Sequence, residues 1–308
     1  MPNCCKHRLV DIVPGEGVAG VWSVLKFAVR AALSVLVGWW LVLALALTPD
    51  PSTGTAHARD PQPALLQAAI ARLAPQRKGV TDVYAIAVAG WAAQDVFVKE
   101  VDGALAAMEQ ILPIRGRTLR LVNNAKTIKT TPLANSQNIA AAVRGIAKTM
   151  DRNEDILLLF MTSHGGQKGI ALQLPSGSST VLAPQELKAM LDGEGIKNRV
   201  VIVSACYSGV FVEPLANDDT IVLTAADAYH PSFGCAAGRD WTYFGDALFK
   251  QGVRPGADLK QAFDHARILI RGWEMMDRFP PSNPQGRFGE ALVAKLDPVL
   301  RSMAGAGQ

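Results

Sequence analysis

The sequence has few cysteines, few aromatic residues and no block of charge of one sign, and these shortages exclude several classes of protein. Cysteine occurs only at positions 4, 5, 206 and 235, without CxxC spacing, so no disulfide framework is expected. Basic residues exceed acidic ones by only four, and the excess is spread along the chain, so nucleic acid is not an expected partner. No GxGxxG or GxxxxGKS/T motif follows the first expected strand, which disfavours a nucleotide-binding protein.

Metal and cofactor sites are not expected either. His164, Cys206, His230 and Cys235 have the side chains that bind zinc. They lack the short paired spacing that structural zinc sites usually show. The sequence therefore predicts no bound metal and no cofactor.

One long apolar run stands near the N-terminus. Residues 31–47 are seventeen residues without a charge, the lower limit for crossing the hydrocarbon core. Lys26 and Arg30 precede the run, so the first residues are expected to stay in the cytoplasm. We favour an uncleaved signal anchor or transmembrane helix over 21–48, which would attach the chain to the membrane. The alternative is a signal peptide cleaved after the AHA tripeptide at 56–58.

This interpretation divides the chain into four parts. A cytoplasmic segment covers 1–20, the anchor 21–48 and a linker 49–63, which is rich in proline, serine, threonine and glycine. A single globular domain is expected over 64–308. Both interpretations of the apolar run export this domain, to the periplasm if the cell is Gram-negative.

Apolar runs and amphipathic segments alternate along the globular domain. We expect strands at 82–89, 118–122, 155–162, 199–203 and 220–224, a hairpin at 169–174 and 179–182, and helices at 64–73, 95–111, 136–150, 183–191, 242–250 and 258–276. The strands are nearly continuous apolar runs, as in strands that are covered on both faces. The alternation predicts an α/β domain with a mostly parallel sheet and helices on both faces.

Two short motifs follow two of these strands directly. The sequence SHGG at 163–166 comes after the strand at 155–162, and SACYSG at 204–209 comes after the strand at 199–203. If the two strands are parallel neighbours, His164 and Cys206 meet at one edge of the sheet, where open α/β folds bind ligands. A thiol beside an imidazole is a nucleophile beside its base. Gly165, together with the backbone N–H of Cys206, could form an oxyanion hole.

Each of these residues also has a structural interpretation. A single cysteine after a strand is most often a buried packing residue, and a histidine beside glycines is most often part of a turn. The joint placement of both residues after buried strands favours the catalytic interpretation. His230 is expected in a loop, with a place at the rim of a substrate site as the less favoured option.

The two motifs resemble those of the legumain-like (asparaginyl endopeptidase) cysteine peptidases, whose relatives include the GPI-transamidase subunit and, more distantly, the caspases. The segments at 224–226, 232–235 and 242–246 support the resemblance, which covers roughly 80–250. It implies a caspase-like three-layer αβα sandwich. It also implies a peptidase that cleaves peptides or proteins through an acyl-enzyme, with Cys206 as nucleophile, His164 as base and Gly165 in the oxyanion hole. Ser204, Ala225 and Asp240 are the candidates that it indicates for substrate binding.

The chain departs from that family at two places. Legumains carry an Asn in the loop after the first strand, which orients the His, whereas this loop reads WAAQDV at 91–96, with Gln94 and Asp95 as its polar residues. Legumains also carry a Glu two residues before the Cys, where this chain has Ser204. The resemblance therefore does not imply selectivity for asparagine. A non-catalytic exported binding module and a transpeptidase or transamidase stay open as alternatives.

Overall fold

The computed structural model describes residues 60–306, and its centre is a six-stranded sheet in the order β2-β1-β3-β7-β8-β9. The first five strands are parallel, and β9 pairs with β8 in the antiparallel sense. The strands are β1 (Val83–Ala89), β2 (Thr118–Val122), β3 (Ile156–Thr162), β7 (Arg199–Ser204), β8 (Thr220–Thr224) and β9 (Gln285–Phe288). The expected α/β class with a mostly parallel sheet is confirmed.

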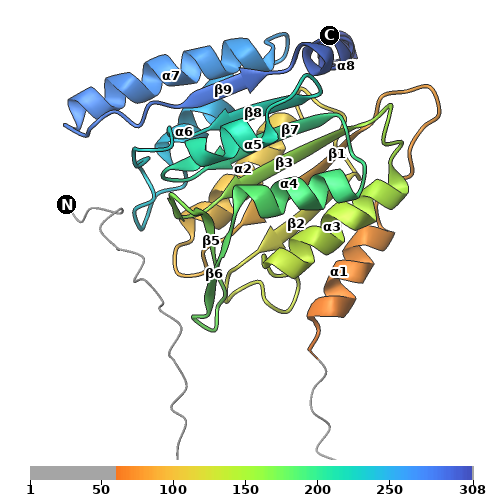
Figure 1. Cartoon of the computed structure of the whole chain (residues 1–308), viewed down its shortest axis with the longest axis horizontal. Helices are drawn as coiled ribbons and strands as arrows, with labels where there is room; N and C mark the ends of the chain where they lie inside the picture. The colour runs from red at the N-terminus through yellow and green to blue at the C-terminus, as the bar shows by residue number, and fades with distance from the viewer. Residues whose placement is uncertain (1–59, 307–308) are drawn as a thin grey trace, which may run out of the picture. The chain divides into compact units, whose positions relative to one another are not determined.

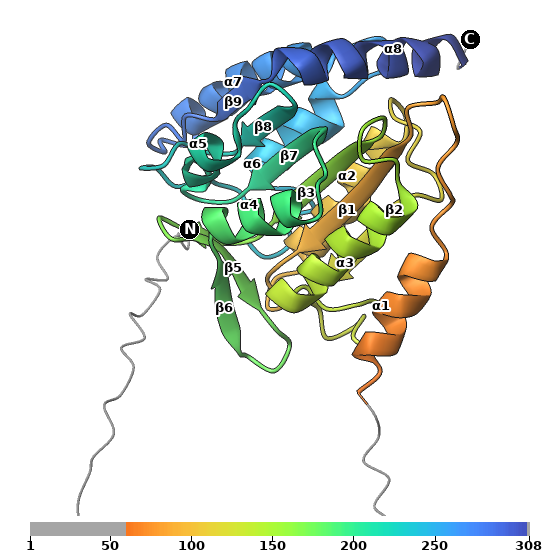
Figure 2. The ribbon, with the colours of Figure 1, turned by 45° about the vertical axis from the view of Figure 1, so that its right-hand side comes forward.

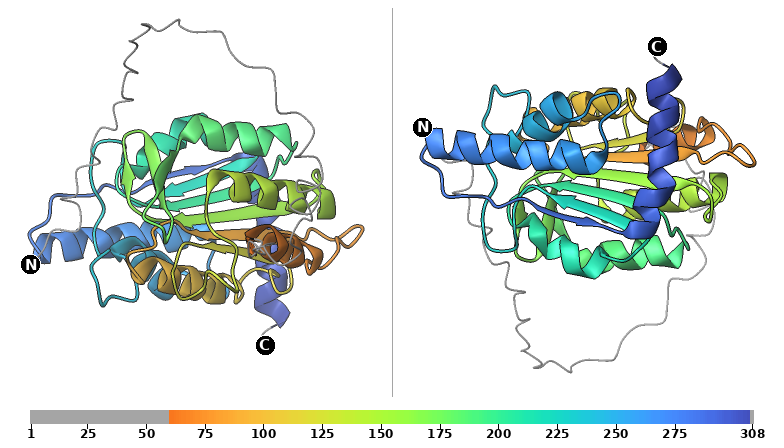
Figure 3. Two further views of the ribbon diagram at one scale, coloured as in Figure 1. Left: turned by 90° about the horizontal axis from the view of Figure 1, so that it is seen from below. Right: turned by 90° about the horizontal axis from the view of Figure 1, so that it is seen from above.

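Helices cover both faces of the sheet and form three layers (Figure 3). One face packs against α2 (Val96–Met108), α6 (Tyr243–Gly245), the π-helical segment η2 (Asp246–Gly252), α7 (Leu259–Met276) and α8 (Glu290–Ala306). The other face packs against α1 (Gln62–Ala71), α3 (Ser136–Thr149), α4 (Pro184–Gly193), the short 3-10 helix η1 (Ser208–Phe211) and α5 (Val212–Leu215). Figure 1 shows their arrangement.

The alternation of side chains along a strand explains why the core strands are apolar throughout. In β3, Leu158 and Phe160 join the core on the α2 face, whereas Leu157 and Leu159 join the core on the α3 face. Every residue of β1, β3, β7 and β8 is buried. A strand buried on both faces has no polar side to display, so it reads as an uninterrupted apolar run.

A small second sheet follows β3. It consists of β4 (Gly165–Gly166), β5 (Gly169–Gln173) and β6 (Ser179–Leu182), all antiparallel. Figure 2 shows the β5–β6 hairpin projecting from the body of the domain. The hairpin is connected to the main sheet through residue 164, so it lies beside the carboxyl ends of the parallel strands.

The expected elements are found within three residues of their expected ends, but the last part of the domain differs. Neither the edge strand β9 nor α8 was expected. The expected helix at 242–250 is α6 followed by the π-helical η2. The predicted anchor at 21–48 lies outside the described residues. Within residues 60–306, no helix combines the length and apolar character needed to cross a bilayer.

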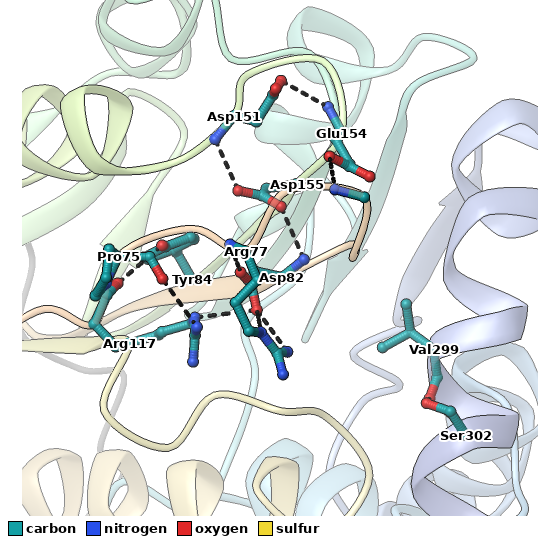
Figure 4. Close-up of polar contacts among 12 residues, drawn as sticks. Pro75, Arg77, Asp82, Tyr84, Arg117, Asp151, Glu154, Asp155, Val299 and Ser302 are labelled. Atoms are coloured by element: carbon teal, nitrogen blue, oxygen red, sulfur yellow. Dashed lines mark hydrogen bonds and ion pairs between the residues drawn. The ribbon is translucent and has the colours of Figure 1, made fainter.

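The amino ends of the strands carry a separate polar cluster, drawn in Figure 4. Asp82, just before β1, is completely buried and accepts hydrogen bonds from Arg77 Nε at 3.0 Å and Nη2 at 2.7 Å. Arg117 Nε lies 3.2 Å from the same carboxylate. Asp155, just before β3, accepts from the backbone N–H of Asp82 and of Asp151, both at 2.8 Å. These contacts join the strand starts at the end of the sheet opposite to His164 and Cys206.

Candidate active site

The two motifs meet at the carboxyl ends of neighbouring strands. β3 and β7 are hydrogen-bonded parallel neighbours with Thr162 opposite Ser204. The register continues one residue further, because the Ser163 N–H donates to the Ser204 carbonyl at 3.2 Å. His164 and Cys206 each follow by two residues, so equal spacing from paired residues brings both to the same edge of the sheet.

Gly165 brings the two segments into direct contact. A Cβ atom at this position would lie 2.3 Å from the Cys206 carbonyl oxygen and 2.9 Å from the Ala205 Cβ. Contacts that short do not occur between real side chains and backbone, so this approach requires glycine. The chain after His164 therefore packs on the backbone of Cys206 itself.

His164 is half-buried and oriented by the loop after β1. Its Nε2 lies 2.5 Å from Gln94 Oε1. The ring packs against the edges of Trp91 and Phe97, at centroid distances of 4.8 and 5.3 Å. The imidazole is thus fixed by one hydrogen bond and two aromatic contacts.

The hydrogen bonds of Gln94 determine which imidazole nitrogen carries the proton. Its Nε2 donates to the Cys235 carbonyl at 2.8 Å, and a carbonyl can only accept, so the amide oxygen must face His164. That oxygen accepts from Nε2–H of the imidazole. In the neutral ring, Nδ1 is then the basic nitrogen.

Cys206 is 7% exposed, and its sulfur lies against the backbone of Ser232. The Ser232 N–H donates to Sγ at 3.3 Å, and the Ser232 carbonyl oxygen lies 3.4 Å from Sγ. An N–H aimed at the sulfur favours the thiolate, whereas the carbonyl accepts from the thiol. Tyr207, with a φ of +57°, lies in the left-handed region and turns the chain sharply after the cysteine.

The loop after β8 forms one wall beside Cys206. The Tyr207 N–H donates to the His230 carbonyl at 2.9 Å. The His230 Nδ1 lies 2.8 Å from both carboxylate oxygens of Asp227, whose Oδ2 also accepts from Asn283 at 2.9 Å. The Asn283 and backbone hydrogen bonds, with His230, lower the pKa of the Asp227 carboxyl against the opposing effect of its burial. His230 is therefore tied to a carboxylate close to the cysteine.

Two of the three substrate-binding candidates are buried next to each other at the ends of β7 and β8, and the third is exposed. Ser204 is buried, and its hydroxyl is directed at Glu100 and Thr242. Ala225 is buried in the core on the α2 face. Asp240 is exposed and forms an ion pair with Lys99 at 2.8 Å, which lowers the pKa of its carboxyl.

Glu100 and Gln94 are the site residues that sequence reasoning missed or left undecided. Glu100 is completely buried, and this burial raises the pKa of its carboxyl to about 7. The sequence holds a signal for it: Glu100 falls on the apolar face of an amphipathic helix, with Phe97 and Ala104 three and four residues away. The signal for Gln94 is its place in the loop where legumains carry an Asn, and the fold shows that this loop reaches His164.

Within residues 60–306, no group of three or more His, Cys, Asp or Glu side chains is placed to hold a metal ion.

Comparisons with known proteins give a family and a likeness to solved structures. A family model described as the Peptidase C13 family matches residues 125–293, a range that includes both His164 and Cys206. Among solved structures, caspase-1 from Spodoptera frugiperda is similar with a TM-score of 0.47 and 12% identity, over 70% of this chain and 93% of that one. No curated protein matches the chain.

Proposed function

The chain belongs to the Peptidase C13 family, the legumain family, whose model matches more than half of its length, and we propose that it is a cysteine endopeptidase with Cys206 as nucleophile and His164 as base. One observation carries the assignment of the residues. Thr162 pairs with Ser204 at the strand ends, and Gly165 packs on the Cys206 backbone two residues further on. A thiol and an imidazole on facing segments at this edge supply the groups that acyl transfer needs.

The proposed reaction begins with proton transfer from the Cys206 thiol to Nδ1 of His164. The thiolate attacks the scissile carbonyl carbon, and the carbonyl oxygen becomes an oxyanion. The imidazolium then protonates the leaving amine as the C–N bond breaks, which leaves a thioester on Cys206. Water, deprotonated by His164, attacks the thioester and releases the carboxylic acid and the thiol.

Backbone N–H groups of Gly165 and Cys206 are the proposed donors to the oxyanion. Bonded and non-bonded pairs alternate in an antiparallel ladder. The Ala171 N–H donates to the His164 carbonyl at 2.9 Å, and the next pair joins Gly165 to Ile170. This alternation directs the Gly165 N–H away from β5, which leaves it available to a substrate.

Gln94 takes the orienting role that an Asn has in legumains. Its oxygen holds the imidazole through Nε2 and keeps Nδ1 as the basic nitrogen. The Ser232 N–H is proposed to stabilise the thiolate. With Ser204 and Ala225 buried, selection of the substrate side chain is assigned to the loop after β8, which lies beside Cys206.

A panel of fluorogenic peptides, varied at the residue before the scissile bond, tests the proposal. Turnover that disappears in both Cys206→Ala and His164→Ala is expected, together with a thioester adduct on Cys206 in acid-quenched mass spectra. Binding without turnover for every peptide would instead indicate a binding module. An added amine captured in the product would indicate transpeptidation through the same acyl-enzyme.

The proposal includes export of the domain by the apolar run at 31–47. Cell fractionation with alkaline extraction, followed by N-terminal sequencing, distinguishes an anchored chain from one cleaved after residue 58. A full-length chain found in the soluble cytoplasm would contradict the export part of the proposal and leave the chemistry untouched.

A further inference from the structure

A buried carboxyl, that of Glu100, lies against the ends of β3 and β7, the strands that precede His164 and Cys206. Glu100 projects from α2, which covers one face of the sheet (Figure 3). Its Oε2 accepts from the Thr162 hydroxyl at 2.6 Å. Its Oε1 accepts from the Thr242 hydroxyl at 2.7 Å and from the Ser204 hydroxyl at 3.2 Å. No part of its side chain is exposed.

Each of these hydroxyls belongs to a different element of the site. Thr162 ends β3 two residues before His164, and Ser204 ends β7 two residues before Cys206. Thr242 is the N-cap of α6, where its hydroxyl accepts from the Gly245 N–H at 3.0 Å. One carboxyl group therefore contacts both catalytic strands and the start of a helix.

The space around the carboxyl leaves it little freedom. A Cβ on Gly245 would lie 1.9 Å from Glu100 Oε1, so any side chain there would displace the carboxyl. The groups that face the carboxyl are the hydroxyls of Thr162, Ser204 and Thr242 and the backbone amide of Gly245, all of them uncharged. The carboxyl is thus held by close packing and hydroxyl groups, with no ion pair among its hydrogen-bond partners.

We infer that Glu100 is a positioning residue that sets the relative place of the ends of β3 and β7, and through them the approach of His164 to Cys206. The inference rests on the proposed function. Removing the carboxyl would take the acceptor from three buried hydroxyls, which costs free energy unless the residues that carry them shift toward new partners. The strand ends that would move lie two residues before His164 and Cys206, which carry the reacting atoms. A displacement of about 1 Å can cost about 100-fold in rate.

Burial raises the pKa of the Glu100 carboxyl to about 7, so near neutral pH this carboxyl is protonated in a large share of the molecules. A protonated carboxyl donates through one oxygen and accepts through the other, and a carboxamide likewise pairs a donor group, its NH2, with an accepting oxygen. Glu100→Gln is therefore the conservative variant, and Glu100→Ala removes the contacts altogether.

Two readouts on the purified full-length protein test the inference. We expect Glu100→Ala to lower kcat by about 100-fold, with KM changed less than twofold, because the residue acts on the geometry of the dyad and touches no substrate. The rate of Cys206 alkylation by iodoacetamide, followed by mass spectrometry, should fall in parallel. Glu100→Gln should restore most of both.

A double-mutant cycle separates positioning from general destabilisation. Thr162→Val removes one hydroxyl at nearly constant shape, and its effect on kcat should largely vanish in a Glu100→Ala background, because both changes break the same link. Additive effects would overturn the inference. So would normal kcat and alkylation in a folded Glu100→Ala protein. Should Glu100→Ala fail to fold, Thr162→Val alone decides the question: kcat and the alkylation rate should both fall, and unchanged values in the folded variant would overturn the inference.

Glu274→Gln is the matched control. Glu274 is also a buried carboxyl with a pKa raised by burial, but it lies on α7 and its hydrogen bond is to the Ser282 N–H at 2.9 Å, instead of to β3 or β7. It should leave kcat and alkylation unchanged. If the wild-type protein neither cleaves peptides nor alkylates faster than a free thiol, the proposed function fails. If it does both and the Glu100 variants match it, only the positioning role fails.

Discussion

The two ends of the parallel sheet bury carboxyl groups in different ways. At the amino end, Asp82 faces Arg77 and Arg117, which supply opposite charge (Figure 4). At the carboxyl end, Glu100 has hydroxyls and one amide, and burial raises its pKa to about 7. A buried carboxylate whose charge is compensated by arginines can stay ionised and connect neighbouring strands. A carboxyl that lacks it can change its proton occupancy near neutral pH, and it lies beside the candidate catalytic residues.

The comparison predicts that a change at the carboxyl end removes activity with little loss of stability. His164→Ala should lower kcat/KM by about 10⁴-fold or more, because it removes the proposed base. The ring is half-buried, so the free energy of unfolding should change little. Peptide turnover and urea denaturation check both parts. Comparable turnover in the variant would contradict the dyad.

A change at the amino end should have the opposite result. Asp82→Ala removes the partner of two arginines, and the Arg117 side chain is largely buried. We expect a loss of about 3–5 kcal/mol in the free energy of unfolding, measured by urea denaturation. The Cys206 alkylation rate of the folded fraction should equal that of the wild type. A large fall in that rate would break the distinction between the two ends.

Gly165→Ala sharpens the assignment of the carboxyl end. Its new Cβ would meet the Cys206 carbonyl, so the two segments must separate and the proposed oxyanion donor must move. A loss of about 10²–10³ in kcat is expected from steady-state kinetics. Gly272→Ala is the control: its Cβ would meet nothing within 4 Å in α7, and stability should rise by about 0.5–1 kcal/mol with kcat unchanged.

The raised pKa of Glu100 predicts a pH-dependent change in stability with a definite sign. Between its ordinary value of 4.5 and its folded value of about 7, the folded protein retains a proton that the unfolded chain releases. Stability therefore falls as pH rises through this window, by about 3 kcal/mol in total, and then levels off. Urea denaturation of the wild type and Glu100→Gln across that range should show the slope in the wild type alone. Parallel curves would mean that Glu100 does not titrate there.

Much of the fold could be predicted because its signals are local. The apolar runs of β3 and β7 identify strands buried on both faces, and SHGG and SACYSG follow them directly. β9 was missed for a different reason. β9 is a short edge strand with partly exposed residues, which pairs only because β8 offers it a free edge.

The sequence by itself determined where the candidate reactive residues lie relative to the strands. A histidine follows one buried strand, a cysteine follows another, and glycine stands where the backbones must approach. Hydrophobic periodicity depends only on residues that are close in the sequence, so these features can be predicted without knowledge of the fold. Only the tertiary structure decided that Gln94 holds His164 and that Glu100 joins Thr162 to Ser204. The partner of a polar side chain depends on which distant segments pack together, and a hydrogen bond across sixty or more residues leaves no periodic trace in the chain.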